Sequence, residues 1–260
     1  MRRLCLFASF VLFTAVGRAQ CNGCPATCND GSQPVCMSGS WECPTLCGSC
    51  WYYPNAPCGY LGTAYCCTDS GGTHVCCSNG SPIVIDTASE GFHLTDLTNG
   101  VKFRELSGLE PVQFSWTDSR FHNAFLALDR NGNGRIDDLT ELFGNLTPQP
   151  LSASPNGYLA LAVFDLPENG GNGNGVIDPG DAVYSSLRLW VDRNHDGISQ
   201  PEELFTLQEG GVFAIDLKYV ETTRQDKFGN QCRYRSRIWN KMHGASEDRC
   251  YDVFLVMEAK

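Results

Sequence analysis

Three segments of the sequence place oxygen-bearing side chains at alternate positions around a glycine, a spacing that suits a hard divalent cation. Calcium takes about six to eight oxygen ligands; in a loop site a glycine allows the sharp bend and a late carboxylate closes the shell. The clearest segment begins at Asp192. Asp192, Asn194 and Asp196 occupy positions one, three and five, Gly197 occupies position six, and Glu203 occupies position twelve. This segment predicts a calcium loop.

The end of this segment departs from the EF-hand pattern. An isoleucine, Ile198, stands at position seven instead of position eight, and its backbone carbonyl is the expected ligand there. The late carboxylate is then either Glu202 or Glu203, and the sequence leaves both open.

A second segment begins at Asp129 and follows the same spacing. Gly134 is at position six and Ile136 at position eight, and the closing glutamate comes one residue late. A hydrophobic pair, Leu142 and Phe143, follows where the pattern has an exit helix. The candidate ligands are Asp129, Asn131, Asn133, the backbone carbonyl of Arg135, Asp137 and Glu141.

A third segment keeps only the second half of the pattern. Its first position falls on Gly170, and the nearest upstream acid, Asp165, is separated from its usual place by extra residues. Asp165 would have to fold back to complete the loop. The candidate ligands are Asp165, Asn172, Asn174, Asp178 and Asp181.

Each segment also has a simpler interpretation, because Asn-Gly and Asp-Gly pairs form ordinary turns. Three such segments with acids in the ligand positions favour calcium over turns alone. Asparagines replace several aspartates, so fewer carboxylates meet the ion than in a tight site. We therefore expect weak structural binding, with dissociation constants of roughly 10⁻⁴ to 10⁻³ M.

The charge distribution agrees with a cation as the ligand. The chain carries a net charge of −10, and residues 82–220 hold 20 acidic against 8 basic residues. Such a domain repels nucleic acid phosphates and anionic lipid surfaces. We therefore expect neither as a partner.

The N-terminal 80 residues indicate export and disulfides. Residues 1–19 read as a secretory signal peptide, with Arg2 and Arg3 before a short apolar run, which predicts a secreted or cell-surface protein without a membrane span. A lipid anchor at Cys21 is the rival interpretation. Residues 20–80 hold twelve cysteines, for which disulfides are favoured over zinc.

The rest of the chain predicts two further regions. Residues 81–220 alternate expected strands, such as 82–85 and 112–116, with a short helix at 158–164, so the fold class expected is α+β. Residues 221–260 read as an antiparallel β extension, closed by a disulfide between Cys232 and Cys250.

Five stretches of the chain follow one another in a specific order and spacing: 125–138, 141–144, 156–161, 176–178 and 187–199. Through them, residues 82–220 resemble the EF-hand-like calcium-binding module of RTX-type secreted bacterial proteins. The resemblance implies a calcium module of surface or adhesion proteins. Some members cut themselves at an Asp-Pro bond before the module; the matching position here, Ser81-Pro82, lacks the aspartate. A fainter resemblance links residues 66–77 to granulin-type repeats.

No catalytic motif accompanies these loops. The five histidines are scattered, and the sequence has no HExxH, no GxSxG and no phosphate-cradling glycine loop. The first hypothesis is therefore a secreted calcium-binding module for adhesion or surface architecture. Two alternatives stay open: a protein that binds an extracellular glycan or protein partner, with calcium rigidifying it, and a calcium-stabilised hydrolase.

Overall fold

The structure is a computed structural model that describes residues 80–105, 110–150, 152, 154–240 and 244–258, together with six short strands between residues 35 and 76. Side chains are described from Gly80 onward, except those of residues 244–248. The chain divides into two compact units, residues 1–77 and 78–260. The predicted signal peptide lies outside the described residues.

Among its described residues, the first unit contains three antiparallel pairs of strands. β1 pairs with β2, β3 with β4 and β5 with β6. The predicted disulfides among the twelve cysteines of residues 20–80 fall on side chains outside the described set. The strands are β1 (Val35–Met37), β2 (Ser40–Glu42), β3 (Thr45–Cys47), β4 (Cys50–Tyr52), β5 (Tyr65–Asp69) and β6 (Gly72–Cys76).

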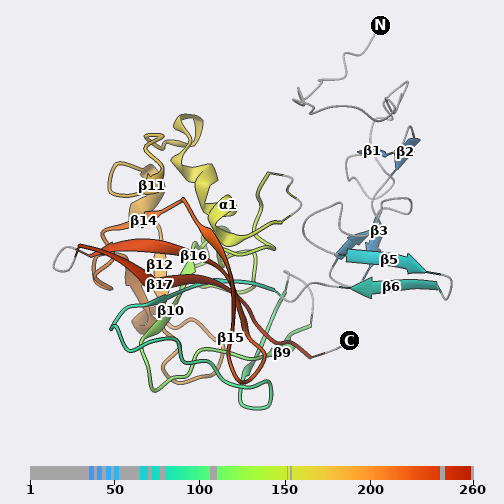
Figure 1. Cartoon of the computed structure of the whole chain (residues 1–260), viewed down its shortest axis with the longest axis horizontal. Helices are drawn as coiled ribbons and strands as arrows, with labels where there is room; N and C mark the ends of the chain where they lie inside the picture. The colour runs from blue at the N-terminus through green and yellow to red at the C-terminus, as the bar shows by residue number, and fades with distance from the viewer. Residues whose placement is uncertain are drawn as a thin grey trace, which may run out of the picture. The chain divides into compact units, whose positions relative to one another are not determined.

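The second unit is built on a nine-stranded antiparallel sheet (Figure 1). The strand order is β11-β14-β16-β17-β7-β10-β12-β13, and β15 pairs with β16. Strands far apart in sequence are thus neighbours. The members are β7 (Ile83–Asp86), β10 (Asn123–Ala127), β11 (Val176–Ile177), β12 (Arg188–Trp190), β13 (Leu204–Thr206), β14 (Ala214–Asp216), β15 (Val220–Gln225), β16 (Gln231–Asn240) and β17 (Gly244–Phe254).

The centre of the sheet is covered on both faces. Every residue of β7 and β10 is buried. Because successive side chains of a strand point to opposite faces, these two strands contribute to two separate hydrophobic clusters. Ile85 and Leu126 belong to one cluster, and Val84 and Phe125 belong to the other.

The first face is covered by the helix α1 (Gly157–Ala162) and by two short 3-10 helices, η1 (Val163–Asp165) and η3 (Ala182–Ser185), whose Phe164, Val183 and Tyr184 pack in or against the cluster of this face. Asn156 caps α1 by accepting hydrogen bonds from the backbone of Tyr158 and Leu159. Tyr158 is fully buried and donates its hydroxyl to the carbonyl of Cys250 (2.9 Å). The other two 3-10 helices are η2 (Pro167–Asn169) and η4 (Pro201–Glu203).

The second face is covered by the hairpin of β8 (Val101–Phe103) and β9 (Val112–Phe114). Behind this hairpin two fully buried indoles, Trp116 and Trp190, meet edge to face with their centroids 5.6 Å apart. This aromatic cluster also forms the floor below one of the carboxylate loops described next.

The prediction of an α+β fold was wrong. The unit is a mostly antiparallel β protein with one short helix, α1, among the described residues. The helix expected after Glu141 does not form, because Leu142 makes a β-bridge with Ala127 and the N–H of Phe143 donates to the carbonyl of Leu126. Apolar residues that suited a helix exit instead extend the sheet. No helix in the described part of the chain is long and apolar enough to cross a membrane.

The predicted disulfide between Cys232 and Cys250 was also wrong. Both residues are buried free thiols. They lie on neighbouring strands, but Cys232 is opposite Val253 while Cys250 is opposite Ser236, and the two thiols belong to clusters on opposite faces of the sheet. Burial raises the pKa of Cys232 to about 11 and that of Cys250 to about 12, so both remain protonated at neutral pH.

Candidate metal centre

The loop 129–141 is held closed by its first and last acids. One carboxylate oxygen of Asp129 accepts the N–H of Gly134 (2.8 Å), and the other accepts two further N–H groups of the turn. Glu141 accepts the N–H of Arg130 (3.0 Å) with one oxygen and that of Asp137 (2.8 Å) with the other. The two carboxylates therefore fix the bend from both ends.

The loop 192–203 repeats this arrangement. Asp192 accepts the N–H of Gly197 (2.9 Å), whose φ of 70° is a left-handed conformation that favours glycine. Glu203 accepts the N–H of Arg193 (2.8 Å). The structure thus places Glu203 as the closing acid, buried at 3 % exposure, while Glu202 is exposed.

The third loop, 165–181, reaches the same arrangement by a longer path. Asp165 does fold back: it accepts the N–H of Gly175 (2.9 Å), ten residues later in the chain. Asp181 accepts the N–H of Asn172 (3.1 Å) with one oxygen and that of Asp178 (2.8 Å) with the other. The residues between Asp165 and Asn172 form the 3-10 helix η2, which accommodates the insertion.

Asparagine amides point toward an acid inside each loop. Oxygen and nitrogen of a carboxamide exchange places on a half-turn, so the same side chains can offer either a donor or an acceptor there. With the oxygens turned inward, each loop would present only oxygen ligands, but each Oδ1 would give up the backbone N–H that it accepts from the residue two positions later. The amide contacts run from Nδ2 of Asn133 to Asp137 (2.5 Å), of Asn174 to Asp178 (3.0 Å) and of Asn194 to Asp196 (2.9 Å).

This donor chemistry fits a hard cation. No group of three or more Asp, Glu, His or Cys side chains converges on one point in the part of the chain that the structure describes. In each loop two or three carboxylates would supply part of the ligand shell, and amide and backbone oxygens would supply the rest. Such a mixed oxygen shell is typical of calcium. Softer metals prefer nitrogen or sulfur, and the loops offer one such side chain, His195, whose Nε2 lies 2.7 Å from the carbonyl of Asn99.

Burial changes the pKa of two of the loop acids, Asp192 and Glu141. Burial raises the pKa of Asp192, and the neighbouring Glu203 raises it further, against the hydrogen bond from Gly197. Trp116 donates its indole N–H to the same carboxylate (2.9 Å). Burial likewise raises the pKa of Glu141. A cation within the loop would offset this cost of burying charge.

Two of the loops are joined directly. Ser199 is buried in the loop 192–203, and its hydroxyl accepts the N–H of Ile136 (2.7 Å) and donates to the carbonyl of Ile136 (3.3 Å). Ile136 belongs to the loop 129–141. One side chain therefore connects the backbone of one loop to the other.

The structure places the sixteen predicted ligands in these three loops, but not all in one role. Six acids pin the loops by accepting backbone N–H groups: Asp129, Glu141, Asp165, Asp181, Asp192 and Glu203. Eight others form the turns or receive the amides: Asn131, Asn133, Asp137, Asn172, Asn174, Asp178, Asn194 and Asp196. Arg135 and Ile198, predicted to act through their carbonyls, lie at exposed positions of the turns.

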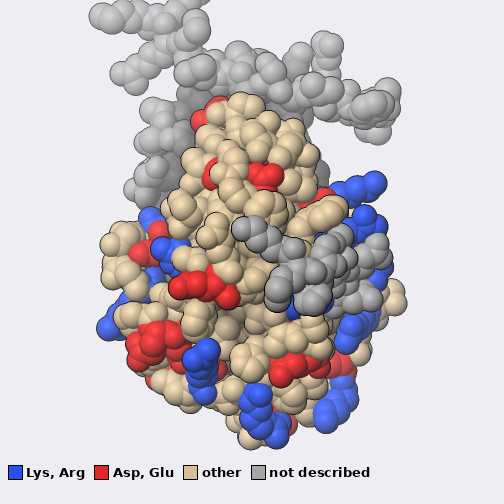
Figure 2. Space-filling view, turned by 90° about the vertical axis from the view of Figure 1, so that its left-hand side faces the viewer, with Lys and Arg blue, Asp and Glu red and all other residues tan. Residues whose placement is uncertain are grey.

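Sequence reasoning missed three contributors. Ser199 joins two loops, Trp116 holds Asp192, and Gln200 donates its amide to Asp196 (2.8 Å). Only Gln200 stood at a position where the loop spacing itself could have indicated it. On the face shown in Figure 2 the acidic side chains form several separate groups rather than one continuous patch.

The fold and the loops define an antiparallel β protein with three loops, each held by two acids that accept backbone N–H groups. A family model, the SPM domain, matches residues 83–256, and the chain belongs to that family. The chain is also 42% identical over 109 residues to the iron-regulated protein FrpA of Neisseria meningitidis serogroup C; the match covers 42% of this chain and 9% of the length of FrpA.

Proposed function

We propose that this protein binds calcium through the loops 129–141, 165–181 and 192–203, as an EF-hand-like module of the RTX type acting outside the cell. The observation that carries the proposal is the repeated arrangement of paired acids. In each loop the first and last acids accept backbone N–H groups, which holds the bend. A loop that is organised in advance loses less conformational entropy on binding.

Each loop would hold its ion with a small set of oxygens. In the loop 192–203 these are Asp192, Asn194, Asp196, Glu203 and the carbonyl of Ile198. In the other loops the equivalent ligands are Asp129, Asn131, Asn133, the carbonyl of Arg135, Asp137 and Glu141, and then Asp165, Asn172, Asn174, Asp178 and Asp181.

The bound ion would supply positive charge to acids that are otherwise close together and partly buried. The role that follows is structural. The loop 129–141 follows β10, the loop 192–203 connects β12 to β13, and the two loops are joined through Ser199, so an ion in either one would stiffen the contact between them. Millimolar calcium outside cells suits the weak affinity that mixed Asn and Asp ligands give. A surface or adhesion module stabilised by calcium is the biological role we propose.

Calorimetric titration of the full chain with calcium tests this proposal. We expect heat of binding at millimolar calcium and a weaker response to magnesium, and a Tm that falls on adding chelator. Asp129→Asn and Asp192→Asn should each remove part of the heat, because each deletes one ligand charge while keeping the shape. The matched control, Glu209→Gln, removes an exposed acid outside the loops and should change neither reading. A Tm that ignores both calcium and chelator would contradict the proposal.

A further inference from the structure

An arginine stands at the second position of two of the three loops. In both, its guanidinium lies over a phenylalanine ring that comes two residues after the closing acid. Cζ of Arg130 lies 5.3 Å from the ring centroid of Phe143, and Cζ of Arg193 lies 5.0 Å from that of Phe205. Both rings pack in or against the hydrophobic cluster of the first face. Each arginine therefore connects the start of its loop to the core residue that follows the end of the loop.

The third loop, 165–181, has no room for an arginine of its own. Its second position is Gly171, where a Cβ would lie 2.1 Å from the backbone carbonyl carbon of Asp165. That is closer than a Cβ can approach a backbone atom, so a side chain at this position would force the turn apart. The fold-back that brings Asp165 into the loop thus excludes the side chain that the other two loops carry here.

Arg130 reaches the third loop instead. Its guanidinium also lies over the ring of Phe164, with Cζ 5.6 Å from the centroid. The rings of Phe143 and Phe164 meet edge to face with their centroids 5.9 Å apart. Phe164 directly precedes Asp165, the first acid of the third loop. One arginine is therefore shared by two loops.

The position of Arg130 depends on the end of its own loop. Its backbone N–H donates to the closing acid, Glu141 (3.0 Å), and its Nε–H donates to the carbonyl of Thr140 (2.9 Å). Its Nη2 is buried and has no hydrogen-bond partner among the described residues, so the two rings hold the outer part of the guanidinium. A change at Asp129 or at Glu141 is thus one residue or one hydrogen bond away from Arg130.

On the other side of the contact, Asp165 holds the third loop by three hydrogen bonds. Its carboxylate accepts the N–H groups of Asn174 (3.2 Å) and Gly175 (2.9 Å). Its carbonyl accepts the N–H of Gly173 (2.8 Å). Phe164 is the neighbour of Asp165 in the 3-10 helix η1. The position of the Phe164 ring therefore affects where the first acid of this loop points.

We propose that Arg130 is a positioning residue that couples the loops 129–141 and 165–181, so that each loop binds calcium more tightly when the other holds its ion. The coupling of calcium binding rests on the function proposed above, whereas the mechanical link stands on the contacts of Arg130. Ordering this side chain between two rings costs conformational entropy. When one loop has ordered it, the other loop has less to order, which gives positive cooperativity without a change of fold.

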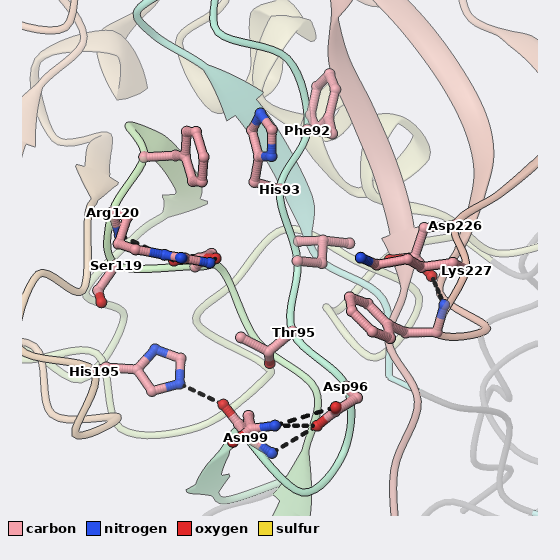
Figure 3. Close-up of a pocket in the computed structure, with 14 residues that line it drawn as sticks. Phe92, His93, Thr95, Asp96, Asn99, Ser119, Arg120, His195, Asp226 and Lys227 are labelled. Atoms are coloured by element: carbon pink, nitrogen blue, oxygen red, sulfur yellow. Dashed lines mark hydrogen bonds and ion pairs between the residues drawn. The ribbon is translucent and has the colours of Figure 1, made fainter.

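The loop 192–203 provides a comparison within the same chain. Arg193 has the same place in its loop and the same kind of ring contact, but Phe205 belongs to the strand β13 that follows that loop. Elsewhere in this loop, Nε2 of His195 lies 2.7 Å from the carbonyl of Asn99, at the edge of a cavity (Figure 3). Neither contact leads to Phe164. Removing Arg193 should therefore disturb its own loop and not the third one.

Hydrogen exchange in chelator tests the mechanical link without any ion. In NMR spectra of the isotope-labelled full chain, the amide of Gly175 reports on the third loop. Arg130→Ala should speed its exchange about fivefold, the effect expected when a partly buried cation–π contact is lost. The matched variant Arg193→Ala should leave it unchanged. Unchanged exchange in Arg130→Ala, or equal acceleration by both variants, would overturn the link.

Calcium titrations followed at single amides test the coupling. The amides of Gly134 and Gly175 each donate to the first acid of their own loop and so report on that loop. Asp129→Asn should weaken calcium binding at Gly175 about threefold or more, within the range seen for contacting residues. With Arg130→Ala present, Asp129→Asn should no longer shift the Gly175 midpoint, whereas with Arg193→Ala the shift should remain. A purely structural Arg130 would lower both affinities and leave the shift intact, which would overturn the coupling.

Phe164→Leu keeps the test decisive if Arg130→Ala does not fold. It removes the ring on the other side of the contact and should abolish the same shift. If both amides respond to calcium but Asp129→Asn does not move the Gly175 midpoint, the coupling is wrong and the calcium function stands. If neither amide responds to calcium while exchange at Gly175 still depends on Arg130, the calcium function is wrong and the mechanical link stands.

Discussion

The loops 129–141 and 192–203 share one pattern of acids but differ in what surrounds them. Asp192 is 1% exposed and lies against the indole of Trp116, inside the aromatic cluster behind the hairpin β8–β9. Asp129 is half-exposed, and the residues 131–135 that it holds are all exposed. The same local hydrogen bonds therefore form part of the core in one loop and of the surface in the other. What each loop contributes to stability follows from this difference and not from its sequence pattern.

The largest effect should come from removing the first acid of each loop in the presence of chelator. Asp192→Ala leaves the N–H of Gly197 and the indole N–H of Trp116 buried without a partner, a loss of about 3 kcal/mol in the free energy of unfolding. Asp129→Ala exposes the N–H groups of its turn to water and should cost about 1 kcal/mol. Urea unfolding of both variants measures the difference. Equal losses would show that burial of the loop does not matter.

A buried acid outside the loops isolates the effect of burial alone. Burial raises the pKa of Asp252 to about 6 from 3.8, against hydrogen bonds from Gly157 and Ser81 that lower it. The folded protein then holds this proton more tightly than the unfolded chain, so the free energy of unfolding rises as the pH falls through the folded pKa toward the unfolded one. Between about pH 8 and pH 4.5 the gain should be about 2 kcal/mol.

Asp252→Asn supplies the control for this pH effect. The amide oxygen can still accept the N–H of Gly157, which the wild-type carboxylate accepts at 2.6 Å, but it binds no proton in this range. Wild type and variant, unfolded in urea at both pH values, should differ by the amount given above in their pH response. Parallel pH profiles would show that Asp252 keeps an ordinary pKa in the folded protein.

Calcium should stabilise the protein by equal increments through the two loops, so the contrast between them should be the same with calcium as with chelator. An ion at ten times its dissociation constant adds about 1.4 kcal/mol per site to the free energy of unfolding, whatever the burial of that site. Asp129→Asn and Asp192→Asn should therefore lose similar increments on calcium addition, although their stabilities in chelator differ. Thermal melts with and without calcium measure each increment. If calcium raises the free energy of unfolding through only one of the loops, the other loop is an ordinary turn that binds no ion.

The sequence was most informative where the chemistry is local. The ligand spacing around Gly134 and Gly197 depends on neighbours within twelve residues, so the loops could be located without a structure. Whether Asp165 folds back depends on the 3-10 helix η2, and the choice of Glu203 over Glu202 depends on burial beside Trp190. Neither of these two outcomes can be predicted from the spacing of residues within the loops.

The fold was less predictable because its sheet pairs strands that are far apart in the sequence. Strand β7 pairs with β17, which places Ile85 opposite Cys250 across most of the chain. The register of β16, β17 and β7 decides which face of the sheet each thiol occupies. The number of residues between Cys232 and Cys250 does not predict that register. Leu142 and Phe143 suit a helix as well as a strand, and only the partner strand β10 decides between them. The cavity lined by residues 92–99, 118–121, His195 and 226–228 could not be predicted from local sequence either, because four separate segments form it.

The smallest predicted effect concerns the contact that joins the two loops. Ser199→Ala removes the partner of both the N–H and the carbonyl of Ile136 at a buried position, which should cost about 1 kcal/mol in stability. If the contact also transmits the state of one loop to the other, Asp129→Asn and Asp192→Asn should be non-additive in calcium-dependent stability, by about 0.5 kcal/mol or more, and become additive once Ser199 is alanine. Calcium-dependent melts of the three single variants, the three double variants and the triple variant measure this coupling. Additive effects in the presence of Ser199 would mean that the hydroxyl joins the two backbones mechanically while each loop meets its ion alone.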